Sequence, residues 1–83
     1  GVPFAGRGYM SAGVRAAMRY AFEELRLRRM EAACLPHNMP SIHLLESVGF
    51  SREGYARKYL CIAGTWQDHL LYALLREDFV TTR

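Results

Sequence analysis

The sequence predicts a small α/β (α+β) domain, residues 1–83, with elements in the order helix, strand, helix, strand, strand. Residues 11–27 repeat apolar side chains every three or four positions, as one face of a helix does. Gly64 lies between two segments, residues 50–62 and 67–75, as the turn of a β-hairpin lies between its two strands. Hydrophobic residues make up 51% of the chain, which is enough for one thin core.

The first helix is expected from Ser11 to Leu27, followed by a short strand from Met30 to Leu35. Basic residues 26–29 suit the C-terminal end of the helix, where the dipole favours positive charge. The predicted core face of the helix consists of Val14, Ala17, Met18, Ala21 and Leu25.

A second helix is expected from Ser41 to Val48, because Pro40 fits its first turn and Gly49 can take the left-handed conformation that ends a helix. The hairpin follows, with residues 63–65 as its turn. Its second arm is apolar without interruption over residues 70–75, which predicts a strand covered on both faces.

Composition narrows the classes of function. The formal net charge of +3 comes from 11 Lys/Arg against 8 Asp/Glu, and arginine favours anionic ligands such as a nucleotide cofactor. The charges form no stripe, so nucleic-acid binding is not expected, and no run reaches membrane-spanning length. We expect Cys34 and Cys61 to be two buried free thiols in a reducing cytoplasm rather than partners in a disulfide. Neither they nor the histidines His37, His43 and His69 have the spacing of a metal site.

The glycine-flanked segment Gly6-Arg7-Gly8 directly precedes the first helix. Glycines allow the backbone to approach a ligand, and the helix N-terminus offers amide donors, so the segment can bind a phosphate. Glycine before a helix is more often a plain turn. In an α/β fold a strand precedes such a turn, and only residues 1–4 are available here. We therefore expect partner strands upstream of Gly1.

Two stretches together resemble the Gcn5-related N-acetyltransferase family: residues 6–10, Gly-Arg-Gly-Tyr-Met, and residues 38–50, an asparagine, a serine three residues later, and a helix ending in Gly-Phe. Residues 29–34 and 44–55 look most like its ribosomal-protein N-terminal acetyltransferase branch. The resemblance implies the C-terminal half of an acyl-CoA N-acyltransferase fold, with a mixed sheet whose upstream strands are absent. It also implies acetyl-CoA as cosubstrate and a primary amine, including a protein N-terminal amine, as acceptor.

By this resemblance, the amides of Gly6, Arg7, Gly8 and Tyr9 hold the pyrophosphate of acetyl-CoA, and Asn38 contacts its pantetheine arm. Arg7 either adds a charge-assisted contact or stays solvated. Asn38 has a second reading, as the cap of the second helix, and the resemblance favours cofactor contact. Ser41 is expected to tie the first turn of that helix.

The sequence departs from the family pattern at Ala5 and Met10 of the loop and, more seriously, at Leu45, where many members carry a tyrosine that protonates the departing thiolate. No catalytic residue is therefore predicted. Glu31 is the acidic residue nearest the expected place for a base, but it reads more readily as a solvated or ion-paired strand residue.

Tyr55, Tyr59, Trp66 and Tyr72 are expected either to line the acceptor side or to pack across the hairpin strands. His69 reads as a proton shuttle or as a surface strand residue.

Two alternatives to an acetyltransferase remain at this point. One is a non-catalytic module for assembly or partner binding, because residues 30–35 would otherwise expose an unpaired strand edge, which also predicts a dimer. The other is a phosphate or nucleotide binder unrelated to acyl transfer, which would not need a pantetheine arm.

Overall fold

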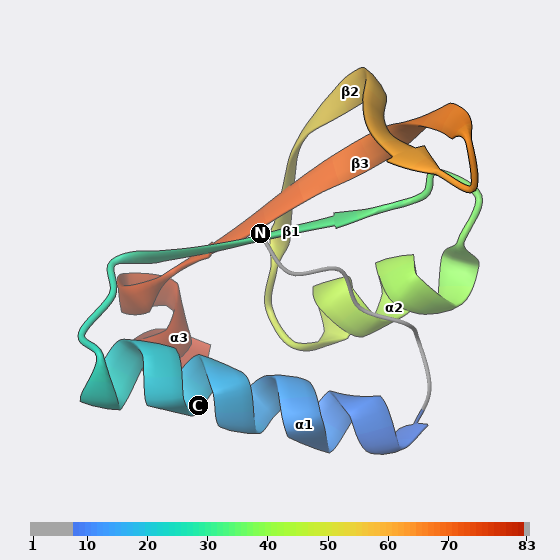
Figure 1. The fold of residues 1–83 in the computed structure, drawn as a ribbon. Helices are drawn as coiled ribbons and strands as arrows, with labels where there is room; N and C mark the ends of the chain where they lie inside the picture. Colours follow the sequence, from blue (N-terminus) through green and yellow to red (C-terminus); the bar gives the residue numbers. More distant parts are fainter. Residues whose placement is uncertain (1–7, 83) are drawn as a thin grey trace.

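The computed structural model describes the backbone of residues 8–82 and the side chains of residues 12–79. The elements follow the order α1 (Gly8–Arg19), η1 (Tyr20–Glu24), β1 (Arg29–Cys34), α2 (Met39–Ser47), β2 (Ser51–Ile62), β3 (Thr65–Leu75) and α3 (Arg76–Thr82). In Figure 1 the three α-helices lie together below a sheet of three strands. The predicted loop at residues 5–7 lies outside the described residues.

The first helix forms where the sequence predicts it, but it starts earlier and ends differently. After Arg19 the helix becomes a π-helical turn, in which the amide of Leu25 donates to the carbonyl of Tyr20 at 3.0 Å. The helix then stops before Arg26, whose φ of 58° is left-handed. The wider turn rotates the following side chains, so Phe22 enters the core and Leu25 does not.

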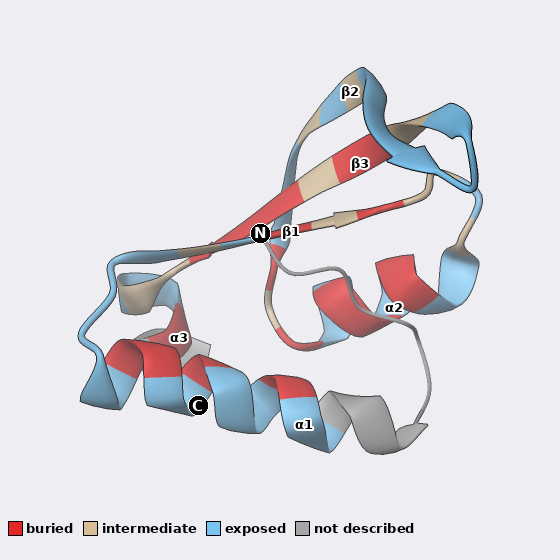
Figure 2. Ribbon diagram, viewed as in Figure 1, coloured by how far each residue is buried: buried red, intermediate tan, exposed pale blue. Residues whose placement is uncertain are grey.

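The predicted core face of this helix is therefore only partly right. Val14, Met18 and Ala21 are buried, whereas Ala17 and Leu25 are exposed. Figure 2 shows the buried residues as a stripe along the side of α1 and η1 that faces the sheet.

The strands have the order β1-β3-β2. Among the described strands both pairings are antiparallel, so the mixed sheet expected from the family resemblance is not seen in this part of the chain. The reason is that β3 is central and runs opposite to both neighbours. Its apolar run is confirmed as the middle of the sheet: Leu70, Tyr72 and Leu74 are buried against the helices.

The hairpin turn is confirmed at Ala63 and Gly64, whose φ values of 51° and 82° match a two-residue turn of type I′. Beyond it the pairing is irregular. Register shifts occur between Ala56 and Leu60 and between Arg52 and Gly54. The bulges bend β2, which arches over the rest of the sheet in Figure 1.

The second helix begins two residues earlier than predicted and ends at Ser47, and Gly49 is left-handed with φ 106°, as expected. The short helix α3 was not predicted, because it has no extended apolar stripe. It packs through Phe79, whose ring centroid lies 5.2 Å from that of Phe22. Within the described residues, no helix has the length and apolar character needed to cross a bilayer.

Candidate functional site

The N-terminal end of α1 carries part of the predicted phosphate site. Gly8 and Tyr9 are the first two residues of the helix, and no acidic side chain lies in its first turn. The amides of a first helical turn have no partner within the helix, so they can donate to an anion. Gly6 and Arg7 lie outside the described residues.

Asn38 occupies the N-cap position of α2. Its side-chain oxygen Oδ1 accepts a hydrogen bond from the amide of Ser41 at 3.3 Å. The capping reading of Asn38 is therefore confirmed, and Ser41 is fully buried within the first turn of the helix. The carboxamide nitrogen Nδ2 of Asn38 donates no hydrogen bond to the described residues. A ligand contact of this group remains a prediction.

The two helix beginnings lie on the same side of the molecule. In Figure 1, α1 and α2 run in similar directions below the sheet, with their N-terminal ends toward the right of the view. Both positive dipole ends therefore point toward the same region, which favours an extended anionic ligand there.

Leu45 lies inside the core, with 0% of its surface exposed. It packs in the same apolar cluster as Val48, Phe50 and Leu74. A side chain at this position cannot reach a ligand without rearrangement of the core, and leucine has no proton to give. Position 45 therefore supplies no general acid.

Tyr72 is also buried, with 1% exposure. Its hydroxyl donates to Oε2 of Glu46 at 2.9 Å, and the guanidinium of Arg52 lies 6.0 Å from the ring centroid. Burial is the main cause that raises the pKa of Tyr72, and Arg52 partly opposes it. The hydrogen bond between Tyr72 and Glu46 connects α2 to the central strand of the sheet.

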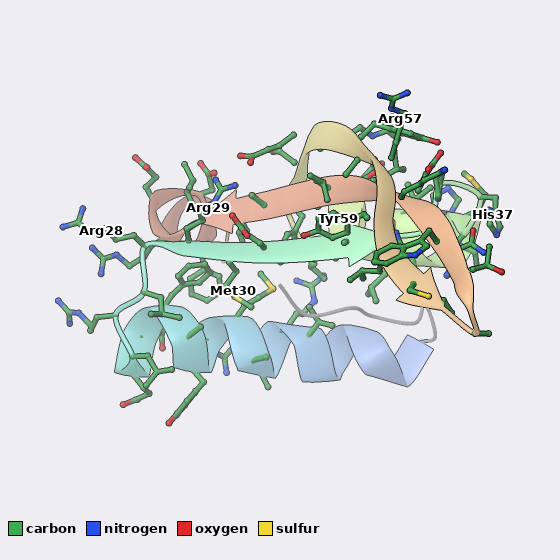
Figure 3. The ribbon with its side chains drawn as sticks, turned by 45° about the horizontal axis from the view of Figure 1, so that its top comes forward. Arg28, Arg29, Met30, His37, Arg57 and Tyr59 are labelled. Atoms are coloured by element: carbon green, nitrogen blue, oxygen red, sulfur yellow. The ribbon has the colours of Figure 1, made fainter. Side chains whose placement is uncertain are left out.

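A cavity of about 310 Å³ opens on the face of the sheet opposite the helices. Residues of all three strands line it. Its apolar and aromatic lining includes Ala33, Leu71, Tyr59 and Leu60. Its charged lining consists of Arg29, Glu31 and Glu53. Figure 3 looks onto this face and shows Tyr59, from the bent β2, above β1, with Arg29 nearer the beginning of that strand.

Arg29 joins the two carboxylates of this cavity. Its Nε donates to Oε2 of Glu31 at 2.8 Å, its Nη1 donates to Oε2 of Glu53 at 3.1 Å, and its Nη2 pairs with Oε1 of Glu53. The hydrogen bonds to Glu53 and then Glu31 raise the pKa of Arg29, and Arg29 in turn lowers the pKa of Glu53. The ion-paired reading of Glu31 is thus confirmed.

A second, more open cavity of about 320 Å³ lies beside the end of β1, lined by Pro36, His37, Tyr55, Trp66, Gln67 and Asp68. Asp68 accepts from the hydroxyl of Tyr55 at 2.7 Å and from the amide of Lys58 at 2.8 Å. The hydrogen bond from Tyr55, followed by that from Lys58, lowers the pKa of Asp68. The hydrogen bond between Tyr55 and Asp68 also raises the pKa of Tyr55. The carboxylate thereby holds the bulge at Lys58, whose φ is 48°.

His69 is buried, so its reading as a surface strand residue is wrong. Its Nδ1 lies 3.0 Å from the carbonyl oxygen of Gln67, and its ring centroid lies 5.7 Å from that of Tyr59. The bulged strand β2 covers it, which an even alternation of inward and outward residues does not predict.

Both cysteines are free, as predicted, but only Cys34 is buried. Burial raises the pKa of the Cys34 thiol. Cys61 is exposed because it lies in the outer part of the hairpin, so its predicted burial is wrong. Within the part of the chain that the structure describes, no group of three or more His, Cys, Asp and Glu side chains could hold a metal ion.

Comparison with known proteins decides the family. The sequence profile of the acetyltransferase (GNAT) domain matches residues 1–51, which include both predicted cofactor segments. The chain belongs to the GNAT acetyltransferase family. As a GNAT chain it is 41% identical to the [Ribosomal protein uS5]-alanine N-acetyltransferase of Escherichia coli, over 100% of its own length and 43% of that protein.

Solved GNAT structures agree with the fold. Ribosomal-protein-S5-alanine acetyltransferase from Vibrio fischeri superposes with a TM-score of 0.81 at 37% identity, covering 92% of this chain and 42% of the other. RimJ of Mycobacterium smegmatis, solved in complex with CoA-disulfide, gives a TM-score of 0.77 at 39% identity, covering 81% of this chain and 32% of the other. The chain spans less than half the length of the curated GNAT relatives it matches.

Sequence reasoning missed the ion pair of Arg29 with Glu53 and the contact of Tyr55 with Asp68 in this GNAT chain. A regular hairpin from the turn at Ala63 and Gly64 would place Tyr55 opposite Tyr72, whereas the bulge places it opposite Leu70. The bulge itself carries no clear sequence signal, because the residue with positive φ is Lys58 rather than a glycine.

Proposed function

We propose that the protein is an N-acetyltransferase that transfers the acetyl group of acetyl-CoA to a primary amine. Membership of the GNAT family supports this, as does the structure of a relative with a CoA compound. The structural observation that carries the proposal is the common orientation of the N-terminal ends of α1 and α2. Two dipole ends facing one region suit the diphosphate and polar arm of a CoA molecule.

In this proposal the amides of Gly6, Arg7, Gly8 and Tyr9 bind the pyrophosphate, and Asn38 binds the pantetheine arm through Nδ2. The fit is chemical: glycine backbone near a helix start leaves room for phosphates, and a carboxamide can cap a helix with its oxygen while its nitrogen donates to a ligand carbonyl.

Acetyl-CoA supplies an activated thioester, which a neutral amine attacks directly when the two are held together. The residues of this chain position the reactants. Since Leu45 is apolar and buried, water protonates the departing thiolate in this proposal.

We propose a protein N-terminal amine as the acceptor, because relatives of this chain carry the name of alanine N-acetyltransferases of a ribosomal protein. We also propose a cytoplasmic protein, since both cysteines are free thiols.

The outer edge of β1 pairs with no other described strand, and this supports self-association as a dimer. Light scattering tests that proposal, and a strictly monomeric mass would contradict it.

Isothermal titration of CoA and of ADP into the protein as its gene encodes it tests the function. CoA should bind more tightly than ADP, because Asn38 contributes only to binding of the pantetheine arm. Gly8→Trp should abolish binding. Gly13→Trp is the matched control: it places the same ring on α1 at an exposed position where a Cβ meets nothing within 4 Å. Equal binding of CoA by wild type and Gly8→Trp would reject the proposal.

A purely non-catalytic module predicts self-association without CoA binding, and a plain nucleotide binder predicts equal affinity for ADP and CoA. The same titrations therefore separate the three readings.

A further inference from the structure

Lys58 is the only lysine of the sequence: the other members of its 11 Lys/Arg residues are arginines. The amine of a lysine becomes a nucleophile when it loses a proton, whereas the guanidinium of an arginine stays charged. Within this sequence, Lys58 is therefore the one side chain to which an acetyl group can be transferred from acetyl-CoA as to any other primary amine.

The backbone of Lys58 is held in place. The residue lies in the bulge of β2, between Ala56 and Leu60, where the register with β3 shifts. Its φ of 48° is left-handed, a conformation that residues with a side chain rarely adopt. Asp68 stabilises it, because its Oδ1 accepts from the amide of Lys58 at 2.8 Å and its Oδ2 accepts from the hydroxyl of Tyr55 at 2.7 Å. A fixed backbone restricts the orientations of the amine, which favours transfer once a donor approaches.

The side chain of Lys58 is exposed. An open cavity of about 690 Å³ lies beside it, lined by Arg57, Lys58 and Asp68. Figure 1 shows the arch of β2 on the side of the sheet opposite α1, and in Figure 3 Arg57, the residue before Lys58, points away from that helix. The bulge therefore lies far from the proposed pyrophosphate site of its own chain, at a place that a second copy can approach.

We propose that Lys58 is acetylated by a second copy of this protein. This inference rests on the proposed function and adds to it a modification site on the enzyme itself. The ammonium group of Lys58 first loses a proton to solvent, and the nitrogen then attacks the carbonyl carbon of acetyl-CoA. The new C–N bond forms as the C–S bond breaks. The second proton of the nitrogen goes to solvent, and the thiolate takes a proton from water, so CoA leaves as the thiol.

Acetylation removes the positive charge of Lys58, and this has a consequence at Asp68. Hydrogen bonds from Tyr55 and from the amide of Lys58 lower the pKa of Asp68, and the charges of Arg57 and Lys58 lower it further. Loss of one of these charges should raise the pKa of Asp68. The modification thus acts on the carboxylate that holds the bulge, and carboxyl carbon NMR of the acetylated protein measures the shift.

A mixture of two forms tests the transfer between copies. Gly8→Trp is expected to lose CoA binding but keeps Lys58, so it serves as the acceptor, labelled with a heavy nitrogen isotope for mass spectrometry. With acetyl-CoA alone it should stay unmodified at Lys58, and addition of unlabelled wild type should acetylate it there. Equal acetylation with and without wild type, or none in its presence, would overturn the proposal.

Arg26→Lys gives a matched comparison within one chain. Arg26 is also exposed and left-handed, with φ 58°, but it follows η1 and lies outside the bulge. Peptide mapping of this variant after incubation with acetyl-CoA compares position 26 with position 58 under the same conditions. Lys58 should be acetylated at least about tenfold faster, because the bulge presents its amine in a restricted orientation. Equal rates would mean that any exposed lysine reacts, and the assignment would be wrong.

A peptide with a free N-terminal alanine separates this inference from the proposed function. If wild type acetylates the peptide but not Lys58, only the assignment of Lys58 falls. If wild type binds no CoA and acetylates neither the peptide nor Lys58, both proposals fall. Acetylation of the peptide and of Lys58, with the preference over position 26, supports both.

Discussion

The hydroxyl of Tyr72 donates a hydrogen bond to Oε2 of Glu46 across 2.9 Å, connecting the central strand to α2. Twenty-six positions separate the two residues in sequence. The bond sets the distance between the sheet and the helix that Asn38 begins, so it links core packing to the predicted cofactor side.

Tyr72→Phe removes this bond while keeping the ring in the core. We expect a loss of about 0.5–1.5 kcal/mol in the free energy of unfolding, the usual net value of one hydrogen bond. Urea denaturation measures it. In Glu46→Ala the same substitution should cost much less, because its partner is already gone; an equal cost in both backgrounds would show that the bond contributes nothing.

Substitutions of Asn38 separate its two roles. Asn38→Ser and Asn38→Asp retain an oxygen that can cap α2, so stability should change little, whereas Asn38→Ala should lose about 1 kcal/mol. CoA affinity should fall in all three, because each lacks Nδ2. Thermal unfolding and calorimetric titration report the two effects. Normal CoA affinity in Asn38→Ser would leave capping as the role of this residue.

Asp68 makes stability depend on pH at the acidic end. Hydrogen bonds from Tyr55 and then Lys58 lower its pKa below the ordinary 3.8, so its contribution is complete above 3.8 and is lost as pH falls through the lowered value. Asp68→Asn should therefore flatten the fall of the urea midpoint in acid, and Glu24→Gln should not. In Tyr55→Phe the pKa of Asp68, followed by carboxyl carbon NMR, should rise toward its ordinary value.

The hairpin turn contains an alanine in a left-handed conformation. Ala63 has φ 51° and Gly64 has φ 82°, with no atom near the added Cβ of the latter. Ala63→Gly should stabilise the protein by about 0.5–1 kcal/mol, and Gly64→Ala should destabilise it by about 1–2 kcal/mol. Thermal denaturation tests both signs, and a stabilising Gly64→Ala would contradict the turn assignment.

Local patterns predict much of this fold because the signals are local. The stripe through Val14 and Met18, the stop at Gly49 and the turn at Gly64 each follow from a few neighbouring residues. The π-helical turn at Tyr20 and the short α3 do not, because tertiary packing of Phe22 on Phe79 accompanies both.

The candidate site is likewise predictable from sequence only in part. The position of Asn38 at a helix start is readable from Pro40 and the apolar residues that follow. The cavity is not, since Glu31 and Glu53 come within reach of one arginine only after three strands pair in an irregular register. Side chains brought together by bulges need the actual structure.

Because β2 arches, this edge strand of the sheet also covers part of the cavity on the sheet face. Among the described residues, the depth of the cavity depends on how sharply β2 curves. Insertion or deletion of one amino acid near Lys58 would alter that curvature without changing the helices, so the shape of the cavity would change while the rest of the fold is retained.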